Sequence, residues 1–313
     1  MTTVRFSADA TQNVIGQLYC SANLTAKIHG QLTFISVLNV LGSITAFLGN
    51  AVILVALRKE SSLHPPSKLL LSNLAATDLC VGLILEPLAG IYLMTVVNEH
   101  WNICRYLLLT GFVIHAILFA VSLLTVTAIS VDRLLALLLG LRYRQVVTLK
   151  RAYVIVVTFW VVSTALTGIY FWNPLVTWWY KIIVVSLSLV TSIFSNTKIY
   201  FGLRHHQNQV GDNIQQPHSN QADELNIARY KRAVSGALWL QFALVACFLP
   251  RVIALALLSK TELSPSVVLV NRYTIAIVYL NSSLNPILFC WKIEGVRQAV
   301  KDTIKQALCH SFS

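Results

Sequence analysis

An aspartate followed by an arginine, Asp132-Arg133, ends the third of seven long apolar stretches in the chain. A carboxylate and a guanidinium at the edge of hydrocarbon are costly unless they pair with each other or serve a function. Charged groups in this position are therefore a functional hypothesis by default. We interpret the pair as a candidate functional site at one surface of a membrane.

A second carboxylate, Asp78, lies deep within the second apolar stretch. There it must be protonated, hydrogen-bonded or bound to a cation, because an unpaired charge in hydrocarbon is too costly. Two interpretations stay open: a polar network that holds helices together, or a small cation site whose occupancy shifts the helix bundle between two packings. The oxygen atoms that a sodium ion needs could come from Asp78, Ser122, Asn281, Ser282 and Asn285.

Helical spacing places polar side chains of the third stretch on one stripe. Counted back from Arg133, Ser122 lies about three turns away and His115 about five turns away. We expect this stripe to face the interior of the bundle.

The seventh stretch, "YLNSSLNPILF", carries a similar polar stripe. Asn281 and Asn285 are four residues apart and share one face of a helix. Pro286 removes a backbone hydrogen bond directly afterwards, which predicts a kink there.

The composition is typical of a membrane protein, with 56% hydrophobic residues, 12% charged residues and a mean hydropathy of +0.67. Soluble domains carry about a quarter charged residues, and a transmembrane helix needs about 20 apolar residues. An all-α bundle of seven transmembrane helices is predicted, near residues 32–57, 69–96, 106–138, 152–172, 178–203, 233–258 and 267–291. The expected organisation is an extracellular segment 1–31, a membrane domain 32–291 and a cytoplasmic segment 292–313.

Most of the 24 lysines and arginines fall in loops on the same side of the membrane as the C-terminus. Cytoplasmic loops are enriched in basic residues, so we expect an extracellular N-terminus and a protein of the plasma membrane. Contact with anionic lipid accounts for the net charge of +12 without any nucleic-acid partner. On the outer side, Asn23-Leu24-Thr25 is an acceptor sequon for glycosylation.

The segment after Trp291 predicts a short amphipathic helix on the inner leaflet. Its apolar residues recur every three or four positions, opposite Arg297, Lys301 and Lys305. Cys309 near its end is either palmitoylated or a free thiol.

Short motifs spread along these stretches together resemble those of the rhodopsin-like (class A) G-protein-coupled receptors, over roughly residues 32–308. In chain order they are Gly49-Asn50, Leu74 to Asp78, Trp101, Asp132-Arg133-Leu134, Trp160, Tyr200, Cys247 to Pro250 and Asn285 to Phe289. Each motif is weak by itself. Their complete set in the expected order makes the resemblance specific.

The resemblance implies a role for each matching residue. Arg133 would engage a heterotrimeric G protein once the sixth helix swings outward, and Asp132 would restrain Arg133 at rest. The five side chains named around Asp78 match the family's sodium pocket. Further switch residues implied are Tyr200, Phe248, Pro250, Asn285, Pro286 and Phe289.

The chain also departs from the family pattern. Leu108 stands where the family has a cysteine bonded to the second outer loop, and residues 168–181 contain no cysteine. Cys20 and Cys104 could instead both face the oxidising exterior, as a disulfide or as two thiols. The short second outer loop, the missing bridge and the absence of proline between 175 and 203 are similar to the melanocortin, adenosine and lipid-receptor branch, the melanocortin receptors most closely.

The resemblance also narrows the ligand. Amine receptors carry an aspartate where this chain has His115, and light-sensing relatives carry a lysine where it has Tyr279, which argues against a monoamine and against retinal. A peptide, a nucleoside and a lipid-like ligand stay open. Candidate ligand contacts are the ionisable side chains of the outer half: Glu86, His115, Arg251 and Arg272. Glu86 and Arg251 could equally pair with each other.

The leading hypothesis is a receptor in which an agonist in the outer half shifts a two-state bundle and opens an inner cleft. The alternatives are an ion- or proton-coupled transporter with Asp78 and Asp132 as relay groups, and a receptor-like scaffold that does not couple to G proteins. Transporters often contain internal repeats, and none is visible here. No catalytic constellation is present, so an enzyme is not expected. The segment "IARYKRAV" offers no acidic partner to Arg133, which predicts appreciable basal activity.

Overall fold

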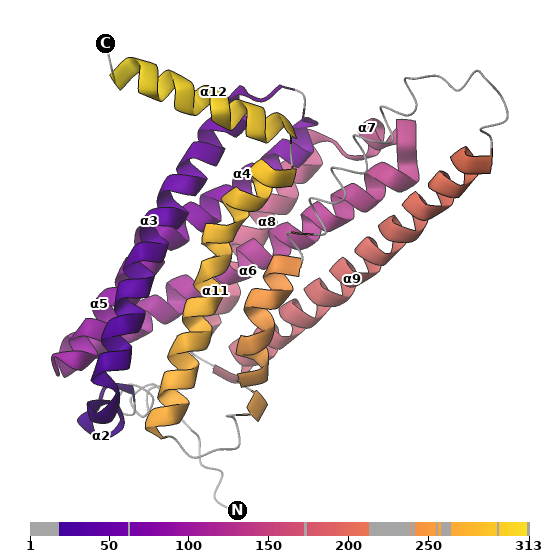
Figure 1. Cartoon of the computed structure of the whole chain (residues 1–313). Coiled ribbons are helices and arrows are strands. Elements are labelled where there is room, and N and C mark those ends of the chain that lie inside the picture. Colours follow the sequence, from indigo (N-terminus) through magenta and orange to yellow (C-terminus); the bar gives the residue numbers. More distant parts are fainter. Residues whose placement is uncertain are drawn as a thin grey trace, which may run out of the picture.

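The chain folds into a bundle of long helices (Figure 1). The computed structural model describes residues 19–61, 63–171, 174–212, 239, 242–254, 256–257, 264–292 and 294–311. Within these ranges no residue lies in a strand. Six helices are long and apolar enough to cross a membrane, and Phe242–Ala254 is a shorter apolar helix. The predicted all-α membrane fold is confirmed.

Up to α9 the helices follow one another with short connections. In chain order they are α2 (Ala22–Thr25), α3 (His29–Lys59), α4 (Pro65–Cys80), α5 (Glu86–Val97), α6 (Trp101–Leu139), α7 (Tyr143–Val146), α8 (Leu149–Gly168), α9 (Pro174–Asp212), α11 (Pro265–Lys292) and α12 (Glu294–Ser311). Three 3₁₀ segments lie between them: η1 (Ala26–Ile28), η3 (Gly140–Arg142) and η4 (Ile169–Phe171).

Local sequence signals explain several helix ends. Two prolines open α4, where the missing N–H groups have no partner to lose. The hydroxyl of Thr148 accepts a hydrogen bond from the Arg151 N–H and caps α8. Gly140 follows α6 with φ of +49°, a backbone conformation that favours glycine and lets the chain leave the helix.

A π-helical segment, η2 (Val81–Leu85), joins α4 to α5 within one membrane span. Gly82 lies in this segment against the backbone of α3. A Cβ atom at Gly82 would lie 2.6 Å from the Phe47 nitrogen and 2.8 Å from the Ala46 Cβ. Only glycine allows the two helices to approach this closely. Segments of this kind are frequent at functional sites, and this one separates Asp78 from Glu86.

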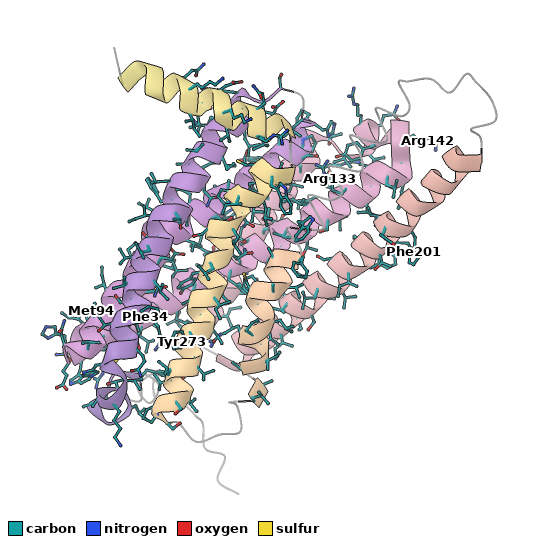
Figure 2. All side chains as sticks on the ribbon, viewed as in Figure 1. Phe34, Met94, Arg133, Arg142, Phe201 and Tyr273 are labelled. Atoms are coloured by element: carbon teal, nitrogen blue, oxygen red, sulfur yellow. A yellow bond between two sulfur atoms is a disulfide. The ribbon has the colours of Figure 1, made fainter. Side chains whose placement is uncertain are left out.

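The two ends of the bundle have distinct cores. At the end near α12, which we call the inner end, the core contains Leu57, Leu74 and Phe289. At the opposite end, which we call the outer end, it contains Leu32 and Tyr92, together with residues of the N-terminal segment. Figure 2 places Arg133 and Arg142 at the end of the bundle near α12, and Phe34, Met94 and Tyr273 at the opposite end.

The outward face of α3 is apolar. Phe34, Leu41 and Leu48 are each more than half exposed, at 55%, 56% and 56%. Exposed apolar surface of this extent marks a face that contacts a membrane. The protein is therefore a multi-pass membrane protein.

Helix α12 lies across the ends of α3 and α11 (Figure 1). Its apolar face is turned to the bundle, since Val296 and Val300 are buried while Arg297 and Lys301 are exposed. The amphipathic arrangement thus follows the pattern in the sequence. Cys309 belongs to α12, but its side chain lies outside the described part of the structure.

Candidate functional site

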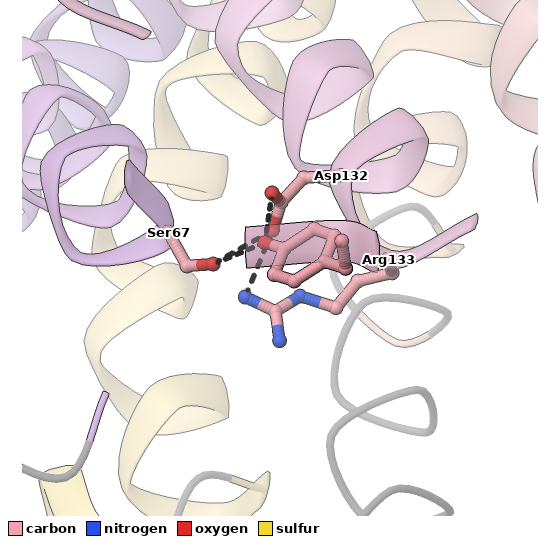
Figure 3. Close-up of polar contacts among 4 residues, drawn as sticks. Ser67, Asp132 and Arg133 are labelled. Carbon is pink, nitrogen blue, oxygen red and sulfur yellow. Dashed lines mark hydrogen bonds and ion pairs between the residues drawn. The ribbon is translucent and has the colours of Figure 1, made fainter. Parts of the chain in front are cut away.

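Asp132 is the centre of a polar cluster at the inner end of α6 (Figure 3). Its carboxylate is buried, with 4% of the side chain exposed. Ser67 of α4 donates to Oδ2 at 2.8 Å, and Tyr143 of α7 donates to Oδ1 at 2.6 Å. The Arg133 Nη2 atom lies 3.1 Å from the same Oδ2. The carboxylate therefore joins three helices and pairs with the arginine beside it.

The environment sets the protonation of two groups that surround this cluster. Burial, followed by the hydrogen bond that Tyr143 donates to Asp132, raises the pKa of the Tyr143 hydroxyl to about 12. Burial lowers the pKa of His64, whose ring centroid lies 4.9 Å from that of Tyr143, below its usual value of 6.5. Tyr143 therefore keeps its proton and donates a hydrogen bond at physiological pH, and the lowered pKa of His64 favours its neutral form.

Asp78 is the centre of a second polar cluster, halfway through the bundle. It is 1% exposed. Its Oδ1 accepts from the Ser282 hydroxyl at 2.8 Å and its Oδ2 from the Asn285 amide at 2.6 Å, which joins α4 to α11. Asn50 of α3 donates to the Ser282 carbonyl at 3.0 Å and brings in a third helix.

Asn281 and Ser122, the other two predicted sodium ligands, make no hydrogen bond to Asp78. Asn281 lies beside Ser282, and its Oδ1 atom is buried without a hydrogen-bond partner among the described residues. Ser122 is half-buried on α6. The observed bonds are those of a polar network, and the Asn281 oxygen is the atom left over for a cation.

A third network was not singled out in the sequence. The Trp160 indole donates to Asn73 Oδ1 at 3.0 Å, and the Asn73 amide donates to the Thr125 hydroxyl at 2.8 Å. The chain from Trp160 to Thr125 joins α8, α4 and α6. Asn73 and Thr125 each lie within an apolar stretch of the sequence. A polar residue in such a stretch needs a partner, so the sequence contained a signal for this network.

Aromatic rings surround His115. Its ring stacks on Phe119 at a centroid distance of 5.7 Å and meets the edge of Tyr279 at 5.7 Å. Phe119 in turn lies 4.8 Å from Phe248. The predicted ligand contact His115 and the predicted aromatic switch Phe248 therefore belong to one aromatic cluster, formed by His115, Phe119, Phe248 and Tyr279.

The other candidate ligand contacts lie around Tyr279, the neighbour of His115, which interacts electrostatically with Arg272, Glu86 and Arg251. Arg251 donates to Asn271 and, at 3.3 Å, to the Thr274 hydroxyl. Glu86 is 1% exposed and lies against Gly42, and its Oε2 has no hydrogen-bond partner among the described residues. The possible ion pair between Glu86 and Arg251 is therefore wrong, because each side chain lies against a different helix.

Arg272 holds the N-terminal segment onto the bundle. Its guanidinium carbon lies 5.2 Å from the Tyr19 ring centroid and 4.5 Å from that of Tyr92, and it donates to the Tyr92 hydroxyl. A disulfide joins Cys20 to Cys104 at the start of α6, with 6.0 Å between the Cα atoms. The sequence had left two possibilities open for Cys20 and Cys104, a disulfide or two free thiols, and the structure contains the disulfide.

Other predicted switch residues are found along the inner half. Pro286 touches α3 at Gly49, where a Cβ atom would lie 2.9 Å from the proline ring. Phe289 is 1% exposed, and Tyr200 is 55% exposed on α9. Pro250 lies in the apolar helix Phe242–Ala254.

Besides the side chain of Cys309, two further sequence predictions fall outside what the structure describes. The side chain of Asn23, the predicted glycosylation site, is one of them, although its backbone belongs to α2. The segment "IARYKRAV", on which the expected basal activity rests, is the other.

The fold and the site thus combine a helical membrane bundle, an acid–arginine pair at one end and a buried central aspartate. The family model described as "7 transmembrane receptor (rhodopsin family)" matches residues 49–173. The chain is similar to this rhodopsin-like family of seven-transmembrane receptors, the family that its motifs resemble.

The relatives of the chain include several kinds of receptor. Adenosine receptor A3 of Canis lupus familiaris is 29% identical over 155 residues, which cover 49% of this chain and 48% of that receptor. Melanocortin receptor 5 of Mus musculus is 23% identical over 292 residues, or 86% and 82% of the two chains. The 5-hydroxytryptamine receptor 1E of Homo sapiens is 31% identical over 124 residues, or 40% and 33%.

The chain spans about half the length of the adenosine receptors that it matches. Adenosine and melanocortin receptors are the branch that the sequence resemblance indicated. All three relatives are receptors and not enzymes, as the sequence predicted for this chain.

Proposed function

We propose that the protein is a G-protein-coupled receptor of the plasma membrane with an extracellular N-terminus. A ligand in the outer half would favour one of two packings of the bundle, and a heterotrimeric G protein would bind the inner end at Arg133. The observation that carries this proposal is the buried cluster of Asp132, Ser67, Tyr143 and Arg133.

The cluster is suited to a switch because Asp132 keeps partners when Arg133 leaves. Ser67 and Tyr143 each donate to one carboxylate oxygen. Leaving a buried charge without any hydrogen bond costs several kcal/mol, and these two donors remove most of that cost. Arg133 can therefore exchange Asp132 for a surface of the G protein at a small net free energy.

Arg133→Ala tests this function. We expect the variant to abolish receptor-dependent nucleotide exchange on purified G proteins, because the group that meets the G protein is gone. Exchange is measured without added ligand in lipid nanodiscs, against a panel of G-protein subtypes. Arg142→Ala, an exposed arginine at the same end of the bundle, is the control and should keep exchange. Unchanged exchange in the Arg133 variant would sink the mechanism, and a wild type that is silent on every subtype would favour the non-coupling scaffold.

We further propose a sodium ion as an allosteric cofactor at Asp78. Ser282 and Asn281 would supply oxygen atoms beside the carboxylate, and the unpartnered Asn281 Oδ1 supports this assignment. The ion would supply positive charge that stabilises one packing of α4 against α11. Ser122, which makes no hydrogen bond to Asp78, would supply a further oxygen atom from α6.

Sodium binding predicts a difference between two chloride salts. Replacing potassium by sodium at constant ionic strength should raise the melting temperature of the wild type, since an ion that binds only the folded state stabilises it. The same exchange should leave Asp78→Asn unchanged. Equal sodium sensitivity of both proteins would remove the cation and leave the polar network.

For the ligand we propose a peptide, a nucleoside or a lipid-like molecule, and not a monoamine or retinal. The residue at the amine-binding position is His115, whose ring stacks on Phe119 and makes a T-shaped contact with Tyr279. The carboxylate of Glu86 lies against Gly42 and interacts electrostatically with Tyr279 of this cluster. A second-messenger screen with compounds of these three classes, and with serotonin and histamine as the opposing set, tests the assignment.

A further inference from the structure

An apolar groove lies on the outward surface of the bundle where α3, α11 and α12 meet. Its volume is about 650 Å³, within the range of about 300–1,000 Å³ that is typical of small-molecule sites. The side chains that matter for its chemistry are Leu48 and Val52 of α3, Ile287 and Trp291 of α11, and Arg297 and Ile304 of α12. None of these residues contributes to the polar clusters described above.

Defined contacts bound the groove at both ends. At one end Gly49 of α3 meets the Pro286 ring so closely that a Cβ atom would lie 2.9 Å from it. At the other end α12 crosses α3 and α11 (Figure 1). Lys59 at the end of α3 donates to the Gln306 side chain of α12 at 2.6 Å and holds α12 there. The groove is therefore a feature of the fold and not a gap between loose helices.

The wall of the groove is hydrocarbon. Leu48, Ile287 and Trp291 are 56%, 64% and 56% exposed in the isolated chain. These residues belong to membrane-spanning helices, and the exposed surfaces of Leu48 and Ile287 would meet lipid acyl chains in a cell. One side of Trp291 packs on Trp239, with 5.1 Å between the ring centroids, and its exposed part completes the wall. An acyl chain removes the apolar surface of these residues from contact with polar groups.

The α12 end of the groove is cationic. Arg297 forms part of its lining, and Lys301 and Lys305 follow on the same helix. The cytoplasmic leaflet carries anionic lipids, and basic pockets between transmembrane helices on that side bind their headgroups. A second copy of this chain is disfavoured as the occupant, because its own basic inner end would face Arg297.

We propose that the groove binds one anionic phospholipid of the inner leaflet. The acyl chain lies against Leu48, Ile287 and Ile304, and the phosphate-bearing headgroup pairs with Arg297. The site needs only the bundle and α12, so it stands whether or not the protein activates a G protein. Its floor includes Pro286, so the lipid also stabilises the contact between α3 and α11.

Trp291 in the wall provides the test. The full-length protein is placed in nanodiscs with bromine on the acyl chains of either phosphatidylserine or phosphatidylcholine, the other lipid being unlabelled. The quenching of Trp291 is obtained by subtracting the signal of Trp291→Phe. We expect brominated phosphatidylserine to quench at a mole fraction about fivefold lower, which is the preference that about 1 kcal/mol from one basic residue gives.

Three α12 variants separate the headgroup contact from general attraction to the membrane. Arg297→Gln should remove the preference for phosphatidylserine, and Arg297→Lys should keep most of it. Lys305→Gln, an exposed cation outside the groove lining, should leave it unchanged. Equal quenching by the two lipids in the wild type overturns the proposal, as does an equal loss in Lys305→Gln and Arg297→Gln. Absence of quenching by either lipid also overturns it, because the groove is then covered by protein.

Discussion

At the scale of single residues, Asp132 divides its partners between two kinds of interaction. Tyr143 and Ser67 are neutral donors at fixed positions on α7 and α4, whereas Arg133 is a charge on a side chain that is 18% exposed. The neutral donors determine how much of the stabilisation of the Asp132 carboxylate must come from Arg133. Removing one of these donors should therefore strengthen the ion pair between Asp132 and Arg133.

Tyr143→Phe tests this reasoning. The variant leaves Asp132 Oδ1 without the tyrosine donor, so the carboxylate depends more on Arg133, and basal nucleotide exchange should fall several-fold. Losing a hydrogen bond to a buried charged group also costs about 1–3 kcal/mol of stability, which a lower melting temperature would report. Tyr153→Phe, at an exposed tyrosine of α8, is the matched control and should change neither quantity. A rise in basal exchange would show that Tyr143 restrains Arg133 directly.

The sequence predicted part of this cluster. Asp132 and Arg133 could be recognised because charged residues stand out against an apolar stretch. Ser67 and Tyr143 could not, because their position beside Asp132 depends on how the segments before α4 and after α6 fold back against each other. The cluster around Asp78 was easier to predict from the sequence. Asp78, Ser282 and Asn285 all lie in apolar stretches, where any polar residue needs a partner.

At the scale of elements, the segment η2 decides how the second membrane span lies against α3. The hydrophobic pattern predicted one continuous helix near 69–96, and the structure interrupts it with a π-helical turn at Val81–Leu85. One extra residue in a turn leaves an apolar stretch apolar, so composition contains no signal for it. The close approach of Gly82 to α3 depends on this turn.

Gly82→Val should destabilise the protein for a steric reason. Its side chain would lie 2.6 Å from the backbone nitrogen of Phe47, which cannot move without bending α3. Overpacking of this kind costs about 1–3 kcal/mol, and the melting temperature should fall accordingly. The control is Gly30→Ala in α3, where a Cβ atom meets nothing within 4 Å and helix propensity favours alanine. An unchanged melting temperature in Gly82→Val would mean that the helices are not in tight contact there.

At the scale of the whole molecule, the two ends of the bundle are held in different ways. The inner end depends on hydrogen bonds around Asp132 that allow exchange of partners. The outer end is closed by the Cys20–Cys104 disulfide and by Arg272 between Tyr19 and Tyr92. We infer that the N-terminal segment limits how far the outer ends of the helices can separate, so that larger rearrangements are confined to the inner end.

The double variant Cys20→Ser with Cys104→Ser tests this division. The bridge joins residues 84 positions apart, and cross-links typically contribute roughly 2–4 kcal/mol by restricting the unfolded chain. We expect a clear drop in melting temperature, together with faster proteolysis of the N-terminal segment. Cys290→Ser, at a half-buried free thiol, is the control and should alter the proteolysis little.

Arg272→Gln extends the same test to the second attachment. The cation–π contacts with Tyr19 and Tyr92 should contribute about 0.5–2 kcal/mol, so the single variant should be the milder of the two. Both attachments hold one segment, and residues that share a structural unit are not additive. Once the bridge is absent, Arg272→Gln should therefore lower the melting temperature by less than it does in the intact protein. Full additivity would show that the disulfide and the arginine stabilise the outer end independently.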